Sequence, residues 1–358
     1  MQSLLSSMRF KPATWLLHIA LATIVVGACV THFFGKQGEV HIRGDQATSL
    51  TIHSLTTTHS LTLFLWDFQI VSDAEGNPVD YISELRIMDR SKHTAAGSQS
   101  SVLSVDEGSL RMNKPLKYHG FRFCQSDYDS DLQGVVLTYN YDPWGIGITY
   151  TGYALLLLAM ITFFFQPHTH FRALLKKSIF GQRSGLYSAC FAVIIVILAA
   201  VMTKVVTPKP PLQPVLQTPL LGIHVSVIML AYTLFAVIMV NGILGLCWSQ
   251  KREQLMHLSQ VLLYPALFCL TAGIFIGAVW ANMSWGRYWG WDPKETWALI
   301  TMLVYALLLH FPWLKHQCKI SNVKYQIIYH LFSVIDFALV LFTYFGVSYL
   351  LGGLHSYA

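Results

Sequence analysis

Long apolar runs and short polar segments alternate along most of the chain. A helix needs about 17 to 25 apolar residues to cross a bilayer, and runs of that length recur through the sequence. They lie near 14–34, 146–165, 186–206, 220–248, 259–281, 295–314 and 326–350. Residues 35–143 differ, because apolar and polar positions alternate over short distances there. The pattern predicts an α-helical polytopic membrane protein with about seven transmembrane helices and one inserted domain.

The inserted segment 35–143 has the pattern of β-structure. Alternation and β-branched residues along Leu61–Val71 predict a strand, and residues 73–78 have the composition of a turn. Repetition of such stretches favours a small β-sandwich or barrel. Its histidines lack the H-x-E or H-x₃-H spacing of metal sites, so we expect solvated or structural roles for them. They are His41, His53, His59, His93 and His119.

Composition supports the membrane assignment. The chain is 54% hydrophobic and 12% charged, and its mean hydropathy is +0.47; these values exclude an ordinary soluble protein. The first span follows Arg9 and Lys11, is too long for a signal-peptide core and has no A-x-A site after it, so we interpret it as an anchor.

Basic residues predict the orientation of the spans, because loops rich in Lys and Arg stay on the cytoplasmic side. One set of loops carries most of them, including Arg172, Lys176, Lys251 and Lys315. Residues 35–143, the loop after 281 and the C-terminus are therefore expected outside the cytoplasmic membrane. The net charge of +6 then reflects topology, and we predict no nucleic-acid partner.

A tryptophan-rich segment, Trp285–Trp297, separates two apolar runs and holds four tryptophans in thirteen residues. An aromatic belt at the membrane surface is one explanation, but four rings exceed that need. Flat faces with single N–H donors suit an apolar planar ligand with acidic edges, and we interpret the segment as a haem platform. Asp292 before Pro293, with Glu295 three positions on, also predicts an N-cap with a capping box.

The string WGRYWGWDPKETWALI resembles the WWD motif of haem-handling proteins in cytochrome c maturation. Flanking segments are similar to System II cytochrome c synthetases, which fuse a ResB-like half to a CcsA-like half. Segments 34–42, 111–120 and 141–145 resemble the ResB half, and segments 220–226 and 352–358 resemble the CcsA half. Most ResB halves carry two further spans before the first one here, and the sequence departs from the family in that respect.

The resemblance covers nearly all of the chain and implies a division into four parts. They are a first transmembrane helix at 1–34, an extracytoplasmic ResB-like β-rich domain at 35–143, a second helix with a basic cytoplasmic loop at 144–184, and a CcsA-like helical domain with five transmembrane helices at 185–358.

Four histidines fall at two depths. His18 and His310 lie near the cytoplasmic ends of their spans, and His224 and His355 near the outer ends. His310 is roughly 25 Å from the Trp-rich loop at 1.5 Å per residue, so the inner and outer histidines cannot hold the same haem. The resemblance implies that each pair supplies the axial ligands of one haem.

Alternatives remain at two of these positions. His330 in the last span competes with His310 for the inner site, and His18 has a packing role as its alternative. Asp336, near the middle of the last span, has no partner evident from sequence. Because an unpaired charge within the membrane is costly, we expect this carboxyl to be paired or protonated.

The resemblance implies a holocytochrome c synthase of the haem lyase type in the bacterial inner membrane. It would transport haem b and join it covalently to the CxxCH segment of exported apocytochrome c, with Trp285, Trp289, Trp291 and Asp292 as the platform. The chain has no C-x-x-C, so thiol-reducing proteins are expected partners.

Two other functions stay open. A haem exporter or haem-delivery protein needs only the two haem sites and no covalent chemistry. An electron-transfer cytochrome needs only a bis-histidine pair in a bundle, but it leaves the Trp-rich loop unexplained.

Overall fold

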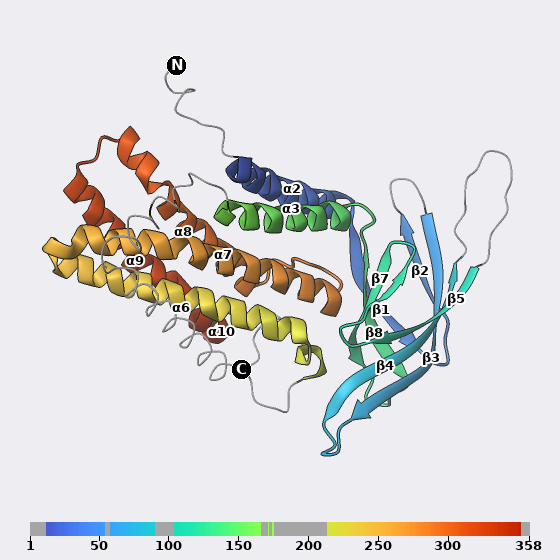
Figure 1. The fold of residues 1–358 in the computed structure, drawn as a ribbon. Helices are drawn as coiled ribbons and strands as arrows, with labels where there is room; N and C mark the ends of the chain where they lie inside the picture. Colours follow the sequence, from blue (N-terminus) through green and yellow to red (C-terminus); the bar gives the residue numbers. More distant parts are fainter. Residues whose placement is uncertain are drawn as a thin grey trace, which may run out of the picture.

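The computed structural model describes residues 12–53, 58–89, 104–165, 171, 174 and 213–351. A bundle of long helices carries a β-domain at one end (Figure 1). The helices are α2 (Pro12–Phe34), α3 (Gly145–Phe165), α6 (Pro219–Cys247), α7 (Arg252–Ser284), α8 (Pro293–Gln317) and α9 (Asn322–Leu341), which continues through the π-helical turn η3 (Phe342–Gly346) into α10 (Val347–Leu350).

Six helical segments of the described part are long and apolar enough to cross a membrane. They coincide with six of the seven predicted spans, so the polytopic helical architecture is confirmed. The remaining predicted span, at 186–206, has no described residues, and almost none of the basic loop 166–184 is described.

The inserted domain is a β-sandwich. One sheet has the order β1-β8-β7-β6 and the other β2-β3-β4-β5, all antiparallel. Inward-facing side chains of both sheets, among them Ile42, Leu63, Leu85 and Phe123, form a single core. The strands are β1 (Lys36–Arg43), β2 (Thr48–His53), β3 (Thr58–Ser72), β4 (Pro78–Asp89), β5 (Ser104–Arg111), β6 (Leu116–Tyr118), β7 (Phe121–Tyr128) and β8 (Gly134–Tyr141).

The predicted turn at 73–78 joins β3 to β4. The Asp73 carboxylate accepts the backbone N–H groups of Glu75 and Asn77, both at 2.9 Å, and Gly76 adopts φ +86°. A side-chain acceptor followed by a glycine in the left-handed region is a turn that the sequence can specify locally.

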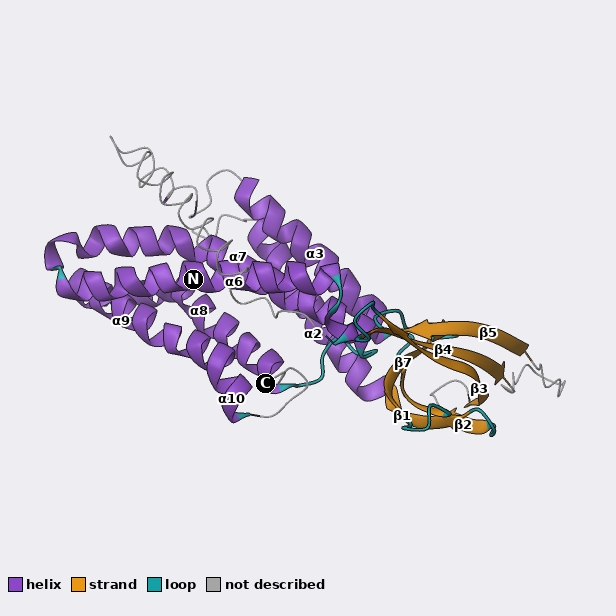
Figure 2. Cartoon of the chain, turned by 90° about the horizontal axis from the view of Figure 1, so that it is seen from below, coloured by secondary structure: helices purple, strands orange, loops and turns teal. Residues whose placement is uncertain are grey.

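The sandwich is inserted between α2 and α3, and all its strands lie beyond one end of the helices (Figure 2). The two helices approach closely because small residues face their partner. A Cβ at Gly27 would overlap Oγ1 of Thr149, and one at Gly152 would lie 2.6 Å from the Ile24 side chain. Helices surrounded by lipid gain little from burying apolar surface against each other. Small residues at their interface let the backbones approach, and van der Waals packing then stabilises the pair.

Replacing Gly27 tests this packing. Gly27→Leu should lower the free energy of unfolding by about 1–3 kcal/mol, the usual cost of overfilling a packed contact. Denaturant titration of the purified protein in detergent measures it. Gly147→Leu is the matched control in α3, because nothing lies within 4 Å of a Cβ there. Equal losses in both variants would show that α2 and α3 do not depend on this contact.

Candidate functional site

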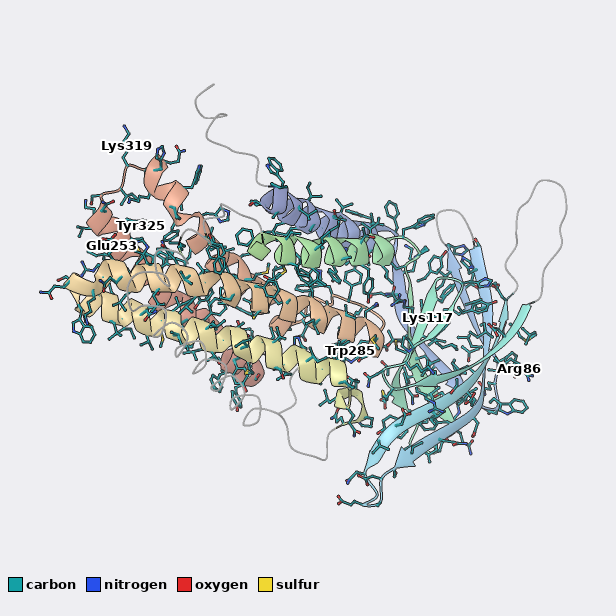
Figure 3. The ribbon with its side chains drawn as sticks, in the orientation of Figure 1. Arg86, Lys117, Glu253, Trp285, Lys319 and Tyr325 are labelled. Atoms are coloured by element: carbon teal, nitrogen blue, oxygen red, sulfur yellow. The ribbon has the colours of Figure 1, made fainter. Side chains whose placement is uncertain are left out.

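The Trp-rich loop connects α7 to α8 at the end of the bundle that faces the sandwich. Figure 3 shows Trp285 there, next to the β-domain. The Trp289 and Trp291 ring centroids are 5.9 Å apart and their planes are perpendicular. Trp291 is 70% exposed and has φ +56°, a strained conformation for a residue with a side chain. The backbone therefore turns so that the Trp291 ring projects outward.

Asp292 caps α8, as the sequence predicts. Its carboxylate accepts the Lys294 N–H at 3.0 Å, and the Glu295 carboxylate accepts the N–H groups of Gly290 at 2.8 Å and Asp292 at 3.3 Å. This reciprocal capping box is confirmed. It fixes the direction in which the Trp-rich loop enters the helix.

Tyr288 anchors the loop between α2 and α3. The side chain is buried, and its hydroxyl lies 2.6 Å from Thr31 Oγ1 and 3.2 Å from Thr149 Oγ1. Thr31 donates its single hydroxyl hydrogen to Asp142 at 2.5 Å, so Tyr288 donates to Thr31 and accepts from Thr149. The result is a directed hydrogen-bond chain from α3 through the loop to a carboxylate at the foot of the sandwich.

The sandwich holds the loop at two further points. Asn140 of β8 donates its side-chain N–H to the Gly286 carbonyl at 2.6 Å, and Ser284 donates to Asn113 Oδ1 at 2.5 Å. Gly286 has φ +74°, and a Cβ there would lie 3.1 Å from Sγ of Cys124. A glycine is thus required where the loop touches β7.

His18 and His310 are exposed, and each uses its ring in the same way. Nδ1 of His18 lies 2.8 Å from the Thr14 carbonyl, and Nδ1 of His310 lies 2.8 Å from the Ala306 carbonyl. A carbonyl only accepts, so Nδ1 carries the hydrogen and the neutral ring keeps its lone pair on Nε2. A metal-bound histidine normally donates its other ring N–H in this manner.

His224 sits in the second turn of α6 and reaches α7. Its Nδ1 donates to the Gly273 carbonyl at 2.7 Å. A Cβ at Gly277 would lie 2.6 Å from the His224 ring, so a glycine provides the space for it. The predicted partner His355 is not among the residues described.

His330 differs from these histidines. It is fully buried, and its Nε2 donates to the Arg252 carbonyl at 2.9 Å. The ring packs directly on Gly245, whose carbonyl in turn accepts from Arg252 Nε at 2.8 Å. His330 thus fastens the α6–α7 turn to α9.

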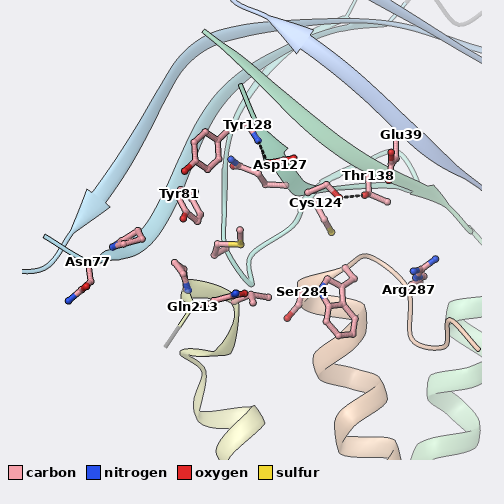
Figure 4. A pocket seen from close by; sticks show the side chains of 17 residues that line it. Glu39, Asn77, Tyr81, Cys124, Asp127, Tyr128, Thr138, Gln213, Ser284 and Arg287 are labelled. Carbon is pink, nitrogen blue, oxygen red and sulfur yellow. Dashed lines mark hydrogen bonds between the residues drawn. The ribbon is translucent and has the colours of Figure 1, made fainter. Parts of the chain in front are cut away.

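A cavity of about 670 Å³ lies between the sandwich and the ends of the helices that face it. Tyr81 and Tyr128 of the sandwich line it opposite Gln213, Ser284 and Arg287 (Figure 4). Cys124 also lines it, and burial raises the pKa of its thiol to about 12. That thiol is therefore protonated at neutral pH and is a poor nucleophile.

This cavity and the junction formed by Tyr288, Asn140 and Ser284 were not predicted. Nothing in the local sequence marks Tyr288 as an anchor within the Trp-rich segment, and the asparagine and serine carry no periodic signal. Their partners lie 139 to 257 positions away in sequence.

Comparison with known families gives two matches. The model of the "Cytochrome C assembly protein" family matches residues 148–355, and the model of the "ResB-like family" matches residues 11–142. Both halves expected from the sequence are therefore present in one chain.

Individual relatives agree. Protein NrfI of Wolinella succinogenes is 41% identical over 158 residues, which cover 41% of this chain and 17% of that protein. Cytochrome c biogenesis protein CcsA of Chlamydomonas reinhardtii is 32% identical over 203 residues, or 53% of this chain and 54% of that one. CcsA of Spinacia oleracea is 43% identical over 109 residues, or 30% and 32%. The matches span about half or less of these relatives.

The capping role of Asp292 generates a prediction about α8. Asp292→Ala should speed hydrogen exchange at the Lys294 amide about fivefold, because losing an N-cap costs about 1 kcal/mol. Asp292→Asn should exchange nearly as the wild type does, since Asn caps almost as well. Hydrogen–deuterium exchange with mass spectrometry measures both. An Asn variant as fast as the Ala variant would show that the loop needs the charge rather than the cap.

Proposed function

Because the chain belongs to the cytochrome c assembly protein family, we propose that it is a cytochrome c synthase of the haem lyase type. It would carry haem b across the bacterial inner membrane and attach it to the CxxCH segment of an exported apocytochrome c. The name of the CcsA relatives, which refers to cytochrome c biogenesis, and the joined ResB-like half support this function.

The geometry of the histidines is the observation that carries the proposal. His18, His310 and His224 each bind a carbonyl through Nδ1, which leaves Nε2 as the nitrogen with the lone pair. His330 instead uses Nε2 to bind the Arg252 carbonyl, and its side chain is fully buried. We therefore favour His310 over His330 as the partner of His18 at an inner haem.

At the outer haem we pair His224 with His355. The Trp-rich loop, with Trp285, Trp289, Trp291 and Asp292, would form the platform between them. Trp291 offers an exposed ring face, while the capping box and the Tyr288 anchor keep the loop rigid. Two strong imidazole ligands disfavour oxygen binding, which suits haem that must stay ferrous in transit.

The orientation follows from charge. Lys251 and Arg252 lie at the α6–α7 turn, and Lys315 and Lys319 near the α8–α9 turn. Figure 3 shows Lys319 at the end of the bundle opposite Trp285. By the positive-inside rule that end is cytoplasmic, and the sandwich, the cavity and the platform face the apocytochrome.

Attachment adds each thiol across one haem vinyl group. The sulfur bonds to one vinyl carbon, the thiol hydrogen goes to the other, and no net oxidation occurs. The protein would act by positioning, because holding the vinyl edge beside the peptide turns a bimolecular step into a nearly unimolecular one. The peptide histidine then replaces one outer ligand. Thiol-reducing partner proteins keep the peptide cysteines reduced.

Coexpression with an apocytochrome c, in a host without its own maturation system, tests the function. We expect covalently bound haem on the cytochrome, seen as haem-dependent staining after denaturing electrophoresis. Trp291→Ala should lower the yield about fivefold, since an aromatic stacking contact contributes about 1 kcal/mol.

Trp248→Ala is the matched control, because this exposed tryptophan lies at the α6–α7 turn. Haem bound to the membrane protein without any covalent cytochrome would contradict the synthase and favour the exporter or haem-delivery protein.

Histidine variants separate the two haem positions. His18→Ala and His310→Ala should purify with little haem, because haem enters by the inner pair. His224→Ala and His355→Ala should retain haem but make no cytochrome. Added imidazole can fill the cavity left by a lost ring, and it should rescue these outer variants more easily than the inner ones because the outer site adjoins water. Haem content measured as the pyridine haemochrome decides between them. His41→Ala is the control, since that ring pairs with Asp129 in the sandwich. Full haem content in both inner variants would leave only one haem position.

A further inference from the structure

The outer face of the sheet β1-β8-β7-β6 lies against the ends of the helices that adjoin the sandwich. Asn140 of β8 binds the Trp-rich loop on this face, and the same row of the sheet continues through Arg122 of β7 to Lys117 of β6. Figure 3 shows Lys117 on the side of the sandwich that faces the helices. Because β6 is the edge strand of the sheet, the row ends in two adjacent basic side chains.

Lys117 and Arg122 lie directly opposite each other in the hairpin of β6 and β7. Their neighbours Tyr118 and Phe121 are buried in the core of the sandwich, so by alternation the two basic side chains point outward. Like charges at opposed positions, where the Cβ atoms are about 5 Å apart, destabilise a sheet. Within the described part of the chain, neither cation forms an ion pair with a carboxylate. An anion bound between them would relieve this repulsion.

A pocket of about 290 Å³ lies between this hairpin and the start of α3, and both basic side chains line it. Asp142 also lines the pocket. Its carboxylate oxygens are already engaged, because one accepts the Thr31 hydroxyl at 2.5 Å and the other accepts the Gly145 N–H at 2.7 Å. Two cations against one carboxylate leave the pocket with a net positive charge, which favours an anionic ligand.

The turn of the hairpin brings an imidazole to the same pocket. His119 has φ +41° and Gly120 has φ +88°, and positive φ at both central residues is the pattern of a type I′ turn. Such turns favour Asn, Asp or Gly at the first of these positions. Here the His119 ring stacks on Tyr118, with ring centroids 4.5 Å apart, and lines the pocket. A further ring N–H donor therefore stands where turn geometry alone would favour a smaller side chain.

The pocket lies at the boundary of the membrane. α2 ends at Phe34 and α3 begins at Gly145, and both helices are long and apolar enough to cross a bilayer. Aromatic side chains are exposed at these two ends, where Phe33 is 71% and Trp144 67% exposed. Exposed tryptophan at the end of a spanning helix is typical of the lipid headgroup layer. Because Gly147 in the first turn of α3 lines the pocket, the pocket is level with the phosphates of the surrounding lipids.

We propose that this pocket binds the phosphate of an anionic phospholipid, held by Lys117 and Arg122 with the His119 ring as a further donor. A guanidinium donates two parallel N–H bonds to a phosphate, and an ammonium adds a compact charge. An anionic headgroup fits better than a zwitterionic one, because a zwitterionic lipid brings a cation of its own into a positive pocket. The bound lipid joins the sandwich to the bilayer beside α3. This inference does not depend on the proposed haem chemistry.

Photolabelling of the full-length protein in vesicles tests the site. The vesicles are phosphatidylcholine with a small fraction of phosphatidylglycerol that carries a photoreactive group beside its headgroup, and mass spectrometry locates the adduct. We expect labelling of the β6–β7 hairpin or the start of α3, and displacement by unlabelled phosphatidylglycerol only. Lys117→Gln and Arg122→Gln should each lower this labelling about fivefold, the usual contribution of one basic residue near an anionic lipid surface. Arg86→Gln is the matched control, because that cation lies on the other sheet and pairs with Glu107.

Denaturant titration in detergent separates a lipid site from a purely structural role. Without phospholipid, Lys117→Gln should be at least as stable as the wild type, because it removes the repulsion between opposed cations. Added phosphatidylglycerol should raise the unfolding midpoint of the wild type, as a ligand of the folded state does, and leave that of the variant nearly unchanged. His119→Asn should keep the fold, since Asn suits the turn, and label less strongly.

Three results would overturn the proposal. Equal displacement of the label by phosphatidylcholine would mean that the pocket does not select an anionic headgroup. Equal displacement by inorganic phosphate would mean a site for a free anion rather than a lipid. Unchanged labelling in both glutamine variants, or a Lys117→Gln variant that is stabilised by phosphatidylglycerol as the wild type is, would place the lipid elsewhere.

Discussion

Polar side chains in the bundle must find their hydrogen bonds within the protein, because the surrounding hydrocarbon offers none. Several of them use the carbonyl one turn earlier on their own helix, as Thr23, Thr162, His18 and His310 do. For a hydroxyl this merely satisfies a donor. For an imidazole it also selects the tautomer, because the hydrogen stays on Nδ1 and the lone pair of the neutral ring on Nε2.

The Trp-rich loop depends on the same constraint at the membrane boundary. Tyr288 inserts its hydroxyl between two threonines of α2 and α3, and Gly286 accepts from Asn140 of the sandwich. The CcsA-like half therefore supplies the aromatic rings, and the ResB-like half fixes where they stand. Because the position of the rings in one half depends on contacts from the other half, there is a physical reason for joining the two halves in one polypeptide.

Sequence patterns were sufficient for the features that depend on local periodicity. Six spans, the sandwich with its turn at Asp73 and the capping box of Asp292 follow from hydrophobic runs, alternation and capping residues, and all are confirmed. The depth of a histidine in its span also follows from counting residues, but the exposure and hydrogen-bond partner of its ring do not. His310 and His330 look alike in sequence, and only packing shows that one ring is exposed while the other clamps Arg252. The ligand roles themselves stay predictions.

The position of the sandwich within the chain has a consequence for biogenesis. Thr31 and Tyr288 are 257 positions apart, so their contact closes only near the end of synthesis. Until then the hairpin of α2 and α3 must keep its own spacing through Gly27 and Gly152, and the sandwich must fold between the two helices. β1 and β8 pair from Lys36 with Tyr141 onward, so completing this ladder brings the two helices together. Folding of the domain is thereby the step that brings its own two helices together, ahead of the CcsA-like half.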